Sequence, residues 1–275
     1  MSTPKLLKIP KQQHTGIPLI GLGTWKLKGK ECEKTVQAAL EMGYRHIDTA
    51  DIYENHQEIG RAIHSWKREE LFLVSKIASY ELSPAAIEKA VPRFLKELKT
   101  DYLDLLLVHW PDPEVSLSDS LQAMLKFKEN GIIRAVGLSN CVRAHLKEIH
   151  PFHFPIATNQ IEIHPYLQRK VLVKACIKEG ISLTAYRPLA KGVFETDPVL
   201  QKIGSHHHKS PSQIALRFLV QQDIVAIPKA ANLQHLENNL HIFDFKLSEQ
   251  EMKEIEKLDQ GKRFCTPDPE YLIED

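Results

Sequence analysis

The sequence contains few cysteines, and they stand far apart. Its 275 residues include four, Cys32, Cys141, Cys176 and Cys265, and no CxxC pair. Zinc ribbons and redox-active dithiols usually take their cysteines from such pairs, so neither kind of site is expected. Sparse, isolated cysteines are typical of a reducing compartment, and we predict a cytoplasmic location.

Long apolar runs are also missing. A helix that spans a bilayer needs about 20 apolar residues, whereas the longest run here, residues 103–108, is of strand length and contains Asp104. Residues 1–16 include no apolar stretch of signal-peptide length. The net charge of +1 provides no field of one sign that would attract nucleic acid or an anionic membrane. We therefore expect the partner to be a small molecule.

The glycines do not form the fingerprint of a dinucleotide-binding open sheet. That fingerprint, GxGxxG, follows the first strand of a doubly wound fold. Residues 21–26 read GLGTWK and lack its third glycine, so the doubly wound sheet is the less favoured alternative. A metal site is not expected either, because His206, His207 and His208 stand together in a polar segment that we interpret as a solvated loop.

What the chain does contain is a regular alternation of apolar and amphipathic segments. Strand-length apolar runs occur at residues 19–23, 44–49, 71–77, 102–110, 135–139, 157–163, 181–186 and 224–228. Amphipathic segments of helix length occur at residues 30–42, 54–65, 84–99, 117–130, 143–149, 168–179, 210–221, 233–240 and 250–258.

Eight such strand–helix units predict one parallel sheet that closes on itself. Continuously apolar strands are typical of parallel strands buried on both faces, with helices covering the outside. The expected fold is an α/β (β/α)8 TIM barrel, with residues 1–275 forming a single domain. An N-terminal β-hairpin around residues 14–16 and an irregular C-terminal tail from residue 261 complete it. Pro92 should kink or break the helix that contains it, because proline removes a backbone donor.

A barrel gathers the residues that follow its strands around one mouth, where the active sites of this fold lie. At those positions the sequence places Trp25, Asp48 with Tyr53, Lys76, His109 with Trp110, Ser139 with Asn140, Gln160 with Glu162, Tyr186 and Lys229. No pair of carboxylates, serine–histidine–aspartate order or metal-ligand spacing competes for the same mouth.

Four of these residues can act together as an acid site. A phenol such as that of Tyr53 is a poor acid at neutral pH, since its ordinary pKa is about 10. It becomes a useful proton donor if a nearby cation stabilises the phenolate. Lys76 would supply that cation, Asp48 would neutralise part of its charge, and His109 would orient or polarise a carbonyl oxygen.

Taken one at a time, the same four residues also have purely structural interpretations. Asp48 could cap the turn that follows it, and Tyr53 could pack at the edge of the core. Lys76 could be a surface lysine whose stem lies along apolar neighbours. A lone histidine such as His109 is more often part of the core. The catalytic interpretation is favoured because all four residues would meet at one mouth.

With these residues identified, the chain resembles the aldo-keto reductase family over essentially its whole length. The matching segments are GLGTW (21–25), YRHIDTADIYEN (44–55), LVSKI (73–77), LKTDYLDLLLVHWP (98–111), GLSN (137–140), NQIEIHPY (159–166), AYRPLAKG (185–192) and IPKAANLQHLENNL (227–240). Within the family it is most similar to the short bacterial 2,5-diketo-D-gluconate reductases, which also reduce methylglyoxal-type dicarbonyls.

The resemblance implies an NADPH-dependent oxidoreductase that reduces carbonyls to alcohols by hydride transfer. The implied substrates are small aldehydes, α-ketoaldehydes or keto-sugar acids such as 2,5-diketo-D-gluconate. In that mechanism Tyr53 donates the proton, and Lys76 lowers the pKa of the phenol. Asp48 holds Lys76, and His109 orients the carbonyl.

The resemblance also implies where the cofactor and substrate bind. For the nicotinamide carboxamide and ring, the implied contacts are Ser139, Asn140, Gln160 and Tyr186, whose ring would stack on the nicotinamide. For the pyrophosphate they are Leu189 and Lys191, and for the adenosine-phosphate end they are Lys229 and Asn239. Trp25, His109 and Trp110 would line the substrate pocket.

Four positions depart from the family pattern. Arg187 stands where a small residue is common, and either binds a phosphate or is solvated. His56 stands where glutamate is usual, so the network around it is open. Asn232 and His235 stand where basic or hydroxyl residues often hold the 2′-phosphate of NADP. NADPH is therefore the expected cofactor, with NADH as the alternative if discrimination is weak.

A binding module is the alternative to an enzyme. A subunit of this fold could sense the nicotinamide redox state on behalf of a protein partner, as potassium-channel β subunits do. The intact set of four site residues favours the enzyme. We expect a monomer, as in most related reductases, while the choice of substrate depends on loops and a tail that sequence patterns do not fold.

Overall fold

The computed structural model describes residues 9–265, which form one sheet of eight strands in the order β1 to β8. Each strand is parallel to the next one along the chain. The strands are β1 (Leu22–Gly23), β2 (His46–Asp48), β3 (Phe72–Ile77), β4 (Leu103–Val108), β5 (Ile133–Ser139), β6 (Ile156–Glu162), β7 (Ser182–Tyr186) and β8 (Val225–Ala226).

The first and last strands meet and close the sheet. Parallel bridges join Ile20 to Ala226 and Gly23 to Lys229. The approach is close at Gly23, where an added Cβ would lie 2.7 Å from the carbonyl oxygen of Ile227. A side chain at this position would push the two strands apart, so glycine suits the seam. The predicted (β/α)8 barrel is confirmed, and the open doubly wound sheet is excluded.

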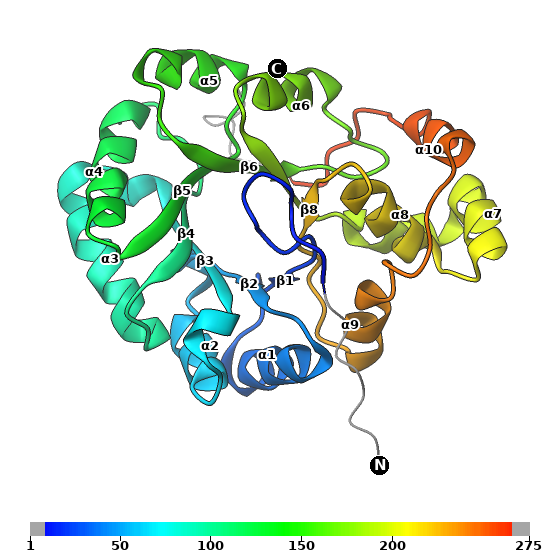
Figure 1. The fold of residues 1–275 in the computed structure, drawn as a ribbon, viewed down its shortest axis with the longest axis horizontal. Helices are drawn as coiled ribbons and strands as arrows, with labels where there is room; N and C mark the ends of the chain where they lie inside the picture. Colours follow the sequence, from blue (N-terminus) through cyan, green and yellow to red (C-terminus); the bar gives the residue numbers. More distant parts are fainter. Residues whose placement is uncertain (1–8, 266–275) are drawn as a thin grey trace.

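Helices surround the barrel on its outside (Figure 1). The α-helices are α1 (Gly29–Met42), α2 (His56–Ile63), α3 (Pro84–Leu98), α4 (Leu117–Glu129), α5 (Arg143–Ile149), α6 (Lys170–Lys178), α7 (Pro198–His207), α8 (Pro211–Val220), α9 (Leu233–Leu240) and α10 (Glu249–Glu256). Short 3₁₀ turns are η1 (Asp51–Tyr53), η2 (Arg68–Glu70), η3 (Ser79–Glu81), η4 (His150–Phe152) and η5 (Ala190–Thr196).

Local sequence signals explain several helix starts. The side chains of Ser210 and Ser248 each accept a hydrogen bond from the backbone N–H three residues later, of Gln213 and Glu251. The side chains of Gln213 and Glu251 in turn accept from the backbone N–H groups of the two serines. Such reciprocal capping boxes satisfy two backbone donors that a helix leaves unpaired. The strands follow from a second feature, burial on both faces. Every residue of β4 is buried, as expected for a strand covered on both faces.

Two predictions about helices, a break at Pro92 and a loop at His206 and His207, are wrong. Helix α3 continues through Pro92 as one helix, and its apolar side, which includes Val91 and Phe94, is buried against the barrel. That packing outweighs the lost backbone bond. The histidine segment is helical too, since it ends α7, with His206 and His207 facing Glu251 of α10. No group of three metal-ligating side chains is found among residues 9–265.

The chain before β1 closes the end of the barrel at which the strands begin. An antiparallel bridge between Lys11 and Pro18 forms the predicted hairpin, which crosses the middle of the barrel (Figure 1). At the other end of the chain, residues 261–265 are irregular as predicted, and the remaining tail positions lie outside the described residues.

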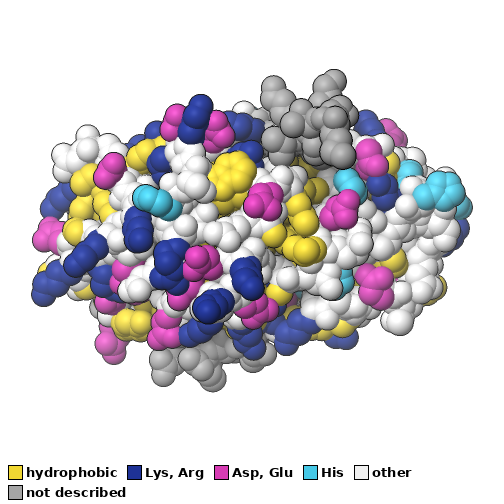
Figure 2. All heavy atoms as spheres, turned by 90° about the horizontal axis from the view of Figure 1, so that it is seen from below, with side chains coloured by type: hydrophobic (Ala, Val, Ile, Leu, Met, Phe, Trp, Pro, Cys, Tyr) yellow, Lys and Arg dark blue, Asp and Glu magenta, His cyan; other side chains and the backbone are white. Residues whose placement is uncertain are grey.

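The described part of the chain offers no membrane-spanning helix, since none of its helices is both long and apolar enough. On the face drawn in Figure 2, basic and acidic side chains are interspersed rather than gathered by sign. This mixture agrees with the near-zero net charge of the sequence.

Candidate active site

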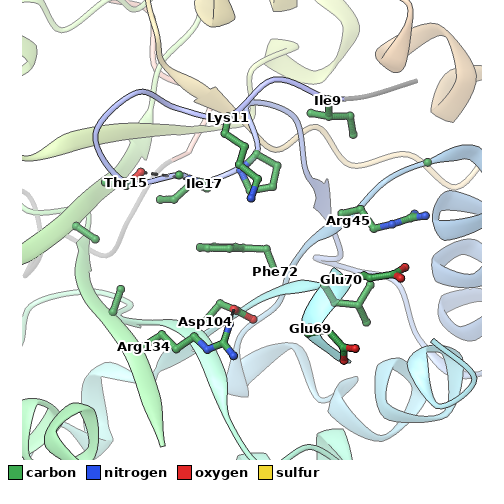
Figure 3. A pocket seen from close by; sticks show the side chains of 16 residues that line it. Ile9, Lys11, Thr15, Ile17, Arg45, Glu69, Glu70, Phe72, Asp104 and Arg134 are labelled. Atoms are coloured by element: carbon green, nitrogen blue, oxygen red, sulfur yellow. Dashed lines mark hydrogen bonds and ion pairs between the residues drawn. The ribbon is translucent and has the colours of Figure 1, made fainter. Parts of the chain in front are cut away.

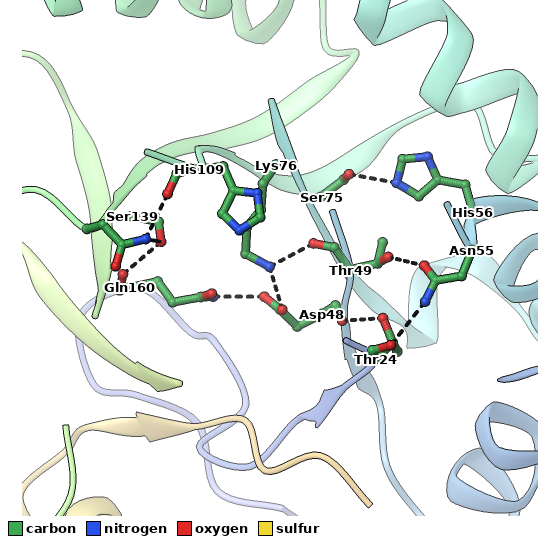
Figure 4. A network of polar contacts seen from close by, with 11 residues as sticks. Thr24, Asp48, Thr49, Asn55, His56, Ser75, Lys76, His109, Ser139 and Gln160 are labelled. Atoms are coloured by element: carbon green, nitrogen blue, oxygen red, sulfur yellow. Dashed lines mark hydrogen bonds and ion pairs between the residues drawn. The ribbon is translucent and has the colours of Figure 1, made fainter. Parts of the chain in front are cut away.

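A buried ion pair lies at the centre of the polar network at the carboxyl ends of the strands (Figure 4). Lys76 Nζ lies 2.6 Å from Asp48 Oδ1 and also donates to the backbone oxygen of Thr49 at 2.8 Å. The side chains of Lys76 and Asp48 are 0% and 2% exposed. Burial lowers the pKa of Lys76, and the charge of Asp48 opposes that shift. The two charges can remain buried because their attraction and their hydrogen bond compensate for the lost contact with water.

Residues from other strand ends hold Asp48 in place. Gln160 Nε2 donates to the second oxygen of Asp48 at 2.8 Å, across the barrel from β6. The backbone oxygen of Asp48 accepts the hydroxyl of Thr24 at 2.9 Å. Asn55 in turn bonds to Thr49 and to the backbone oxygen of Thr24. The ion pair therefore has little freedom to rotate.

Tyr53 lies over this pair, on the short turn η1 that follows β2. Lys76 Nζ is 5.1 Å from the centroid of the phenol ring. The sequence led us to expect that Lys76 lowers the pKa of Tyr53, and the structure corrects this for the free protein. Burial, followed by the charge of Asp48, raises the pKa of Tyr53 well above its ordinary value. The phenol therefore keeps its proton at neutral pH, while Lys76 is engaged by Asp48 and Thr49.

His109 follows β4 and packs edge-on against Tyr53, with ring centroids 5.6 Å apart. Burial, and then the charge of Lys76, lowers the pKa of His109 well below its ordinary value. The imidazole is therefore neutral and can both donate and accept one hydrogen bond. Its Nδ1 is buried and has no partner within the described part of the chain.

These groups face a cavity of about 530 Å³. Tyr53, His109, Trp25 and Trp110 line it, whereas Lys76 does not and can act only through its neighbours. Its rim is apolar and open to solvent, since Trp25, Ile52 and Tyr80 are among the exposed large apolar residues. The remaining lining residues are Gly23, Thr24, Asp48, Ala78, Ser79, Ser139, Asn140, Gln160, Tyr186, Arg187, Ile227, Lys229 and Cys265.

One wall of the cavity carries amide and hydroxyl groups in fixed positions. Asn140 donates to the backbone oxygen of His109 at 2.9 Å and accepts the phenol of Tyr186 at 2.8 Å. Ser139 donates to the backbone oxygen of Gln160 at 2.9 Å. A carboxamide requires donors and acceptors of this kind beside a flat ring, and Tyr186 offers such a ring. This set fits the nicotinamide end of the expected cofactor.

A groove of about 540 Å³ continues from the cavity. Leu189, Lys191 and Asn239, three of the residues implied for the rest of the cofactor, line it. Trp25, Arg187 and Lys229 line both hollows and mark where they meet. The groove has the cations that phosphates need, so the residues present fit a nicotinamide dinucleotide. All of the proposed site residues thus lie in, or directly behind, one continuous surface.

Some contacts of the site had no signal in the sequence. The backbone oxygen of Thr49 accepts from Lys76, and a backbone group cannot be recognised from residue type. Cys265 reaches the cavity because the buried carboxylate of Glu162 accepts the backbone N–H groups of Phe264 and Cys265, at 2.8 and 2.9 Å. Glu162 was predicted at the mouth, but its role in holding the tail was not.

His56 has a structural role that the sequence left open. Its two ring nitrogens lie 3.0 Å from Glu97 Oε2 and 2.9 Å from Ser75 Oγ, and its ring packs edge-on against Phe94. It therefore ties α2 to α3 and to β3. Because Ser75 precedes Lys76, this contact supports the strand that carries the lysine.

A larger hollow, of about 770 Å³, lies at the opposite end of the barrel (Figure 3). Its charged lining is balanced, with Lys11, Arg45 and Arg134 against Glu69, Glu70 and Asp104. Arg134 lies 3.3 Å from Asp104, so part of this charge is already paired. Polar groups at this end of a barrel usually serve stability. The chemistry therefore belongs to the smaller cavity.

Buried histidines predict how stability depends on pH. Burial is the first cause that lowers the pKa values of His46, His56 and His109. Their pKa values are therefore lower in the folded than in the unfolded state, and the unfolded chain takes up protons first on acidification. These histidines should therefore not reduce the free energy of unfolding above about pH 6.5. Below that pH the free energy of unfolding should decrease, even before carboxylates are protonated near pH 4.

Urea denaturation at about pH 7.5 and at about pH 5.5 measures this effect. The variant His46→Gln, which lies away from the cavity, should show a smaller difference between the two conditions. A free energy of unfolding that stays constant or rises on acidification would contradict the prediction.

Comparison with known proteins agrees with this geometry. The model of the aldo/keto reductase family matches residues 19–260. Glyoxal reductase of Bacillus subtilis (strain 168) is 39% identical over 280 residues, which span 98% of this chain and 99% of that protein. An aldo-keto reductase of Mycolicibacterium smegmatis is 39% identical over 270 residues, with 95% and 96% covered.

Solved structures agree as well. A protein assigned as 2,5-diketo-D-gluconic acid reductase B is 35% identical, with a TM-score of 0.91 over 95% of each chain. The aldose reductase of Schistosoma japonicum is 36% identical, with a TM-score of 0.86 over 91% of each chain. The resemblance inferred from sequence is thereby confirmed. The chain belongs to the aldo/keto reductase family and is an oxidoreductase that reduces carbonyl groups.

Proposed function

We propose that the protein reduces a small aldehyde or dicarbonyl compound to an alcohol, with NADPH as hydride source and Tyr53 as proton donor. The observation that carries this proposal is the buried pair of Lys76 and Asp48 beneath a protonated Tyr53, beside a neutral His109. All four residues stand at strand ends of one barrel mouth, where a carbonyl could reach Tyr53 and His109 together.

The reaction adds a hydride and a proton across the carbonyl. When bound, the reduced nicotinamide supplies the hydride to the carbonyl carbon, and the oxygen takes up the former π electrons. Tyr53 gives its phenolic proton to that oxygen, which completes the alcohol. Lys76 stabilises the phenolate that remains, since its ammonium lies near the ring. His109, being neutral, can donate a hydrogen bond that orients the carbonyl.

The remaining proposed contacts belong to the cofactor. Ser139, Asn140 and Gln160 would hold the carboxamide, and Tyr186 would stack on the ring. Leu189 and Lys191 would follow the pyrophosphate. Lys229 and Asn239 would bind the adenosine-phosphate end. The lining supports this assignment, because the four residues proposed for the nicotinamide line the cavity and the other four line the groove that continues from it.

A panel of carbonyl substrates tests the proposal. Methylglyoxal, glyoxal, an uncharged aromatic aldehyde and 2,5-diketo-D-gluconate are each followed at the NADPH absorbance. The names of the bacterial relatives make the dicarbonyls and the keto-sugar acid the first candidates. Steady NADPH oxidation with any of them supports the enzyme. Tight cofactor binding with no turnover on any carbonyl would instead favour the redox-sensing subunit.

Cofactor choice should be only moderately selective. Asn232 Oδ1 accepts the backbone N–H of Gln234 at 2.8 Å and caps α9, so only its neutral Nδ2 amide group remains to donate to a phosphate. His235 lines the groove, and an imidazole attracts phosphate less than a guanidinium does. We expect kcat/KM to favour NADPH over NADH by less than about a thousandfold, a difference of about 4 kcal/mol.

Steady-state rates with both cofactors measure this ratio, and the matched variant His235→Arg should raise the preference for NADPH about tenfold. A wild-type preference above a thousandfold would refute weak discrimination. The predicted cytoplasmic location and monomeric state remain proposals, which fractionation and sedimentation would address.

A further inference from the structure

Arg187 occupies an unusual position at the mouth of the barrel. It directly follows β7 and adopts a left-handed backbone conformation with φ of 48°. Such a conformation is uncommon for residues other than glycine and is energetically unfavourable for them. The side chain is half-buried rather than solvated. The surroundings of Arg187 therefore hold it in place despite this cost.

Two contacts fix the guanidinium. Nη1 donates to the backbone oxygen of Phe264 at 2.7 Å, and the group lies over the ring of Trp25, 4.8 Å from its centroid. A guanidinium has five N–H donors, and Phe264 engages only one of these groups. Within residues 9–265 no carboxylate forms an ion pair with Arg187. In that part of the chain its charge is therefore positioned but not neutralised.

The location of this charge decides what it can reach. Arg187 lines both the catalytic cavity and the groove that continues from it. Its charge acts on Tyr53, because it opposes the rise in the pKa of that phenol. Of the other cations of the site, Lys76 is buried and paired with Asp48, whereas Lys229 lines both hollows as Arg187 does. Among the described residues, Arg187 is thus a guanidinium without a carboxylate partner, and it faces the space where substrate and cofactor would meet.

We infer that Arg187 binds an oxyanion group at the junction of the cavity and the groove. The guanidinium fork matches the geometry of both a carboxylate and a phosphate. The anion would be either a carboxylate on the carbonyl substrate or the pyrophosphate of the dinucleotide. This inference rests on the proposed reductase function, and it makes Arg187 a specificity-determining residue that the family pattern does not supply.

The test compares Arg187→Met and Arg187→Lys with the wild type. Methionine keeps much of the length without charge, and lysine keeps the charge without the fork. Two aldehydes of nearly equal shape, 4-carboxybenzaldehyde and 4-nitrobenzaldehyde, report on a substrate carboxylate. Calorimetric titration with NADP⁺ reports on the pyrophosphate without requiring turnover. Lys30→Met, which removes an exposed charge from α1, controls for net charge.

Each outcome has a definite meaning. If KM rises about ten- to a hundredfold for the carboxylate alone in Arg187→Met, and less in Arg187→Lys, the anion is on the substrate. If instead the Kd for NADP⁺ rises by that factor, and the reduction rates of both aldehydes fall equally at limiting cofactor, the anion is the pyrophosphate.

Two results would overturn the inference. One is a KM and a Kd within about twofold of the wild-type values. The other is an equal loss with both aldehydes while the Kd for NADP⁺ is unchanged, because that would mean only that the wall around Phe264 had moved. Wild-type protein that reduces no carbonyl would refute the proposed function, while the NADP⁺ titration would still test Arg187.

Discussion

Replacing Tyr53 with phenylalanine should lower kcat by about a hundred- to ten-thousandfold, the usual contribution of a positioned general acid. The substitution removes one oxygen and leaves the ring. The edge-on contact with His109 and the approach of Lys76 to the ring both involve the ring itself, so the geometry of the site should persist. The loss should therefore concern the proton and not the architecture.

A measurement of cofactor binding distinguishes the loss of the proton donor from a change in the architecture of the site. Tyr53 stands on the turn after β2, whereas Ser139 and Asn140 at the end of β5 carry proposed contacts to the nicotinamide. The Kd for NADP⁺ should stay within about twofold of the wild-type value. Single-turnover reduction of methylglyoxal with bound NADPH measures the chemical step. The control Tyr102→Phe removes the same atom near the start of β4, outside the cavity, and should leave the rate unchanged.

Reduction by Tyr53→Phe at a near-normal rate would refute the assignment of the proton donor. The pKa of Tyr53, which lies well above its ordinary value, adds a condition to this mechanism. The phenol must lose its proton only as negative charge develops on the substrate oxygen. A structure in which the resting phenol was already ionised would have no proton to give.

Replacing Lys76 with methionine should damage both stability and activity. The substitution leaves the carboxylate of Asp48 buried without its partner, and breaking a buried ion pair typically costs about 3–5 kcal/mol. Gln160 still donates to the second oxygen, which moderates the loss but does not neutralise the charge. Turnover should fall because no cation remains to stabilise the phenolate.

A double variant distinguishes the two consequences. Lys76→Met combined with Asp48→Asn removes both charges and keeps similar shapes. Since a buried pair can often be replaced by neutral groups at little cost, most of the free energy of unfolding should return. Activity should not return, because the double variant also lacks the cation. Urea denaturation and kcat on the same preparations measure the two quantities.

A Lys76→Met variant that unfolds within about 1 kcal/mol of the wild type would contradict this account of the pair. Recovery of turnover in the double variant would show that the charge of Lys76 has no part in the chemistry. The side chain of Lys76 is buried and does not line the cavity. A loss of turnover in Lys76→Met would therefore reflect an effect exerted through its neighbours, such as Tyr53.

Parts of the protein follow from local sequence alone. Strands such as β4 are apolar apart from one residue, Asp104, because both faces are buried. Serines such as Ser210 and Ser248 mark helix starts through their own side chains. The predicted hairpin and the eight-unit barrel depend on patterns of this kind. Strand ends then fix which residues share a mouth, so Tyr53, Lys76 and their partners could be named from their positions.

Other parts depend on contacts between distant segments. The helical course through Pro92 follows from packing against the barrel, and the role of His56 follows from its meeting Ser75 and Glu97. Arg187 is held by Trp25 and by Phe264, which lies 77 residues further along the chain. No local pattern contains these partners.

The sequence by itself therefore determined the barrel, the family and the four residues proposed for catalysis. Only the tertiary structure decided the charge states at the mouth. The sequence predicted a lowered pKa for Tyr53 because it placed Lys76 nearby, whereas the fold buries the phenol and gives the ammonium to Asp48 and Thr49. Ionisation depends on desolvation and on which partner lies within hydrogen-bond distance, and both are properties of packing rather than of residue order.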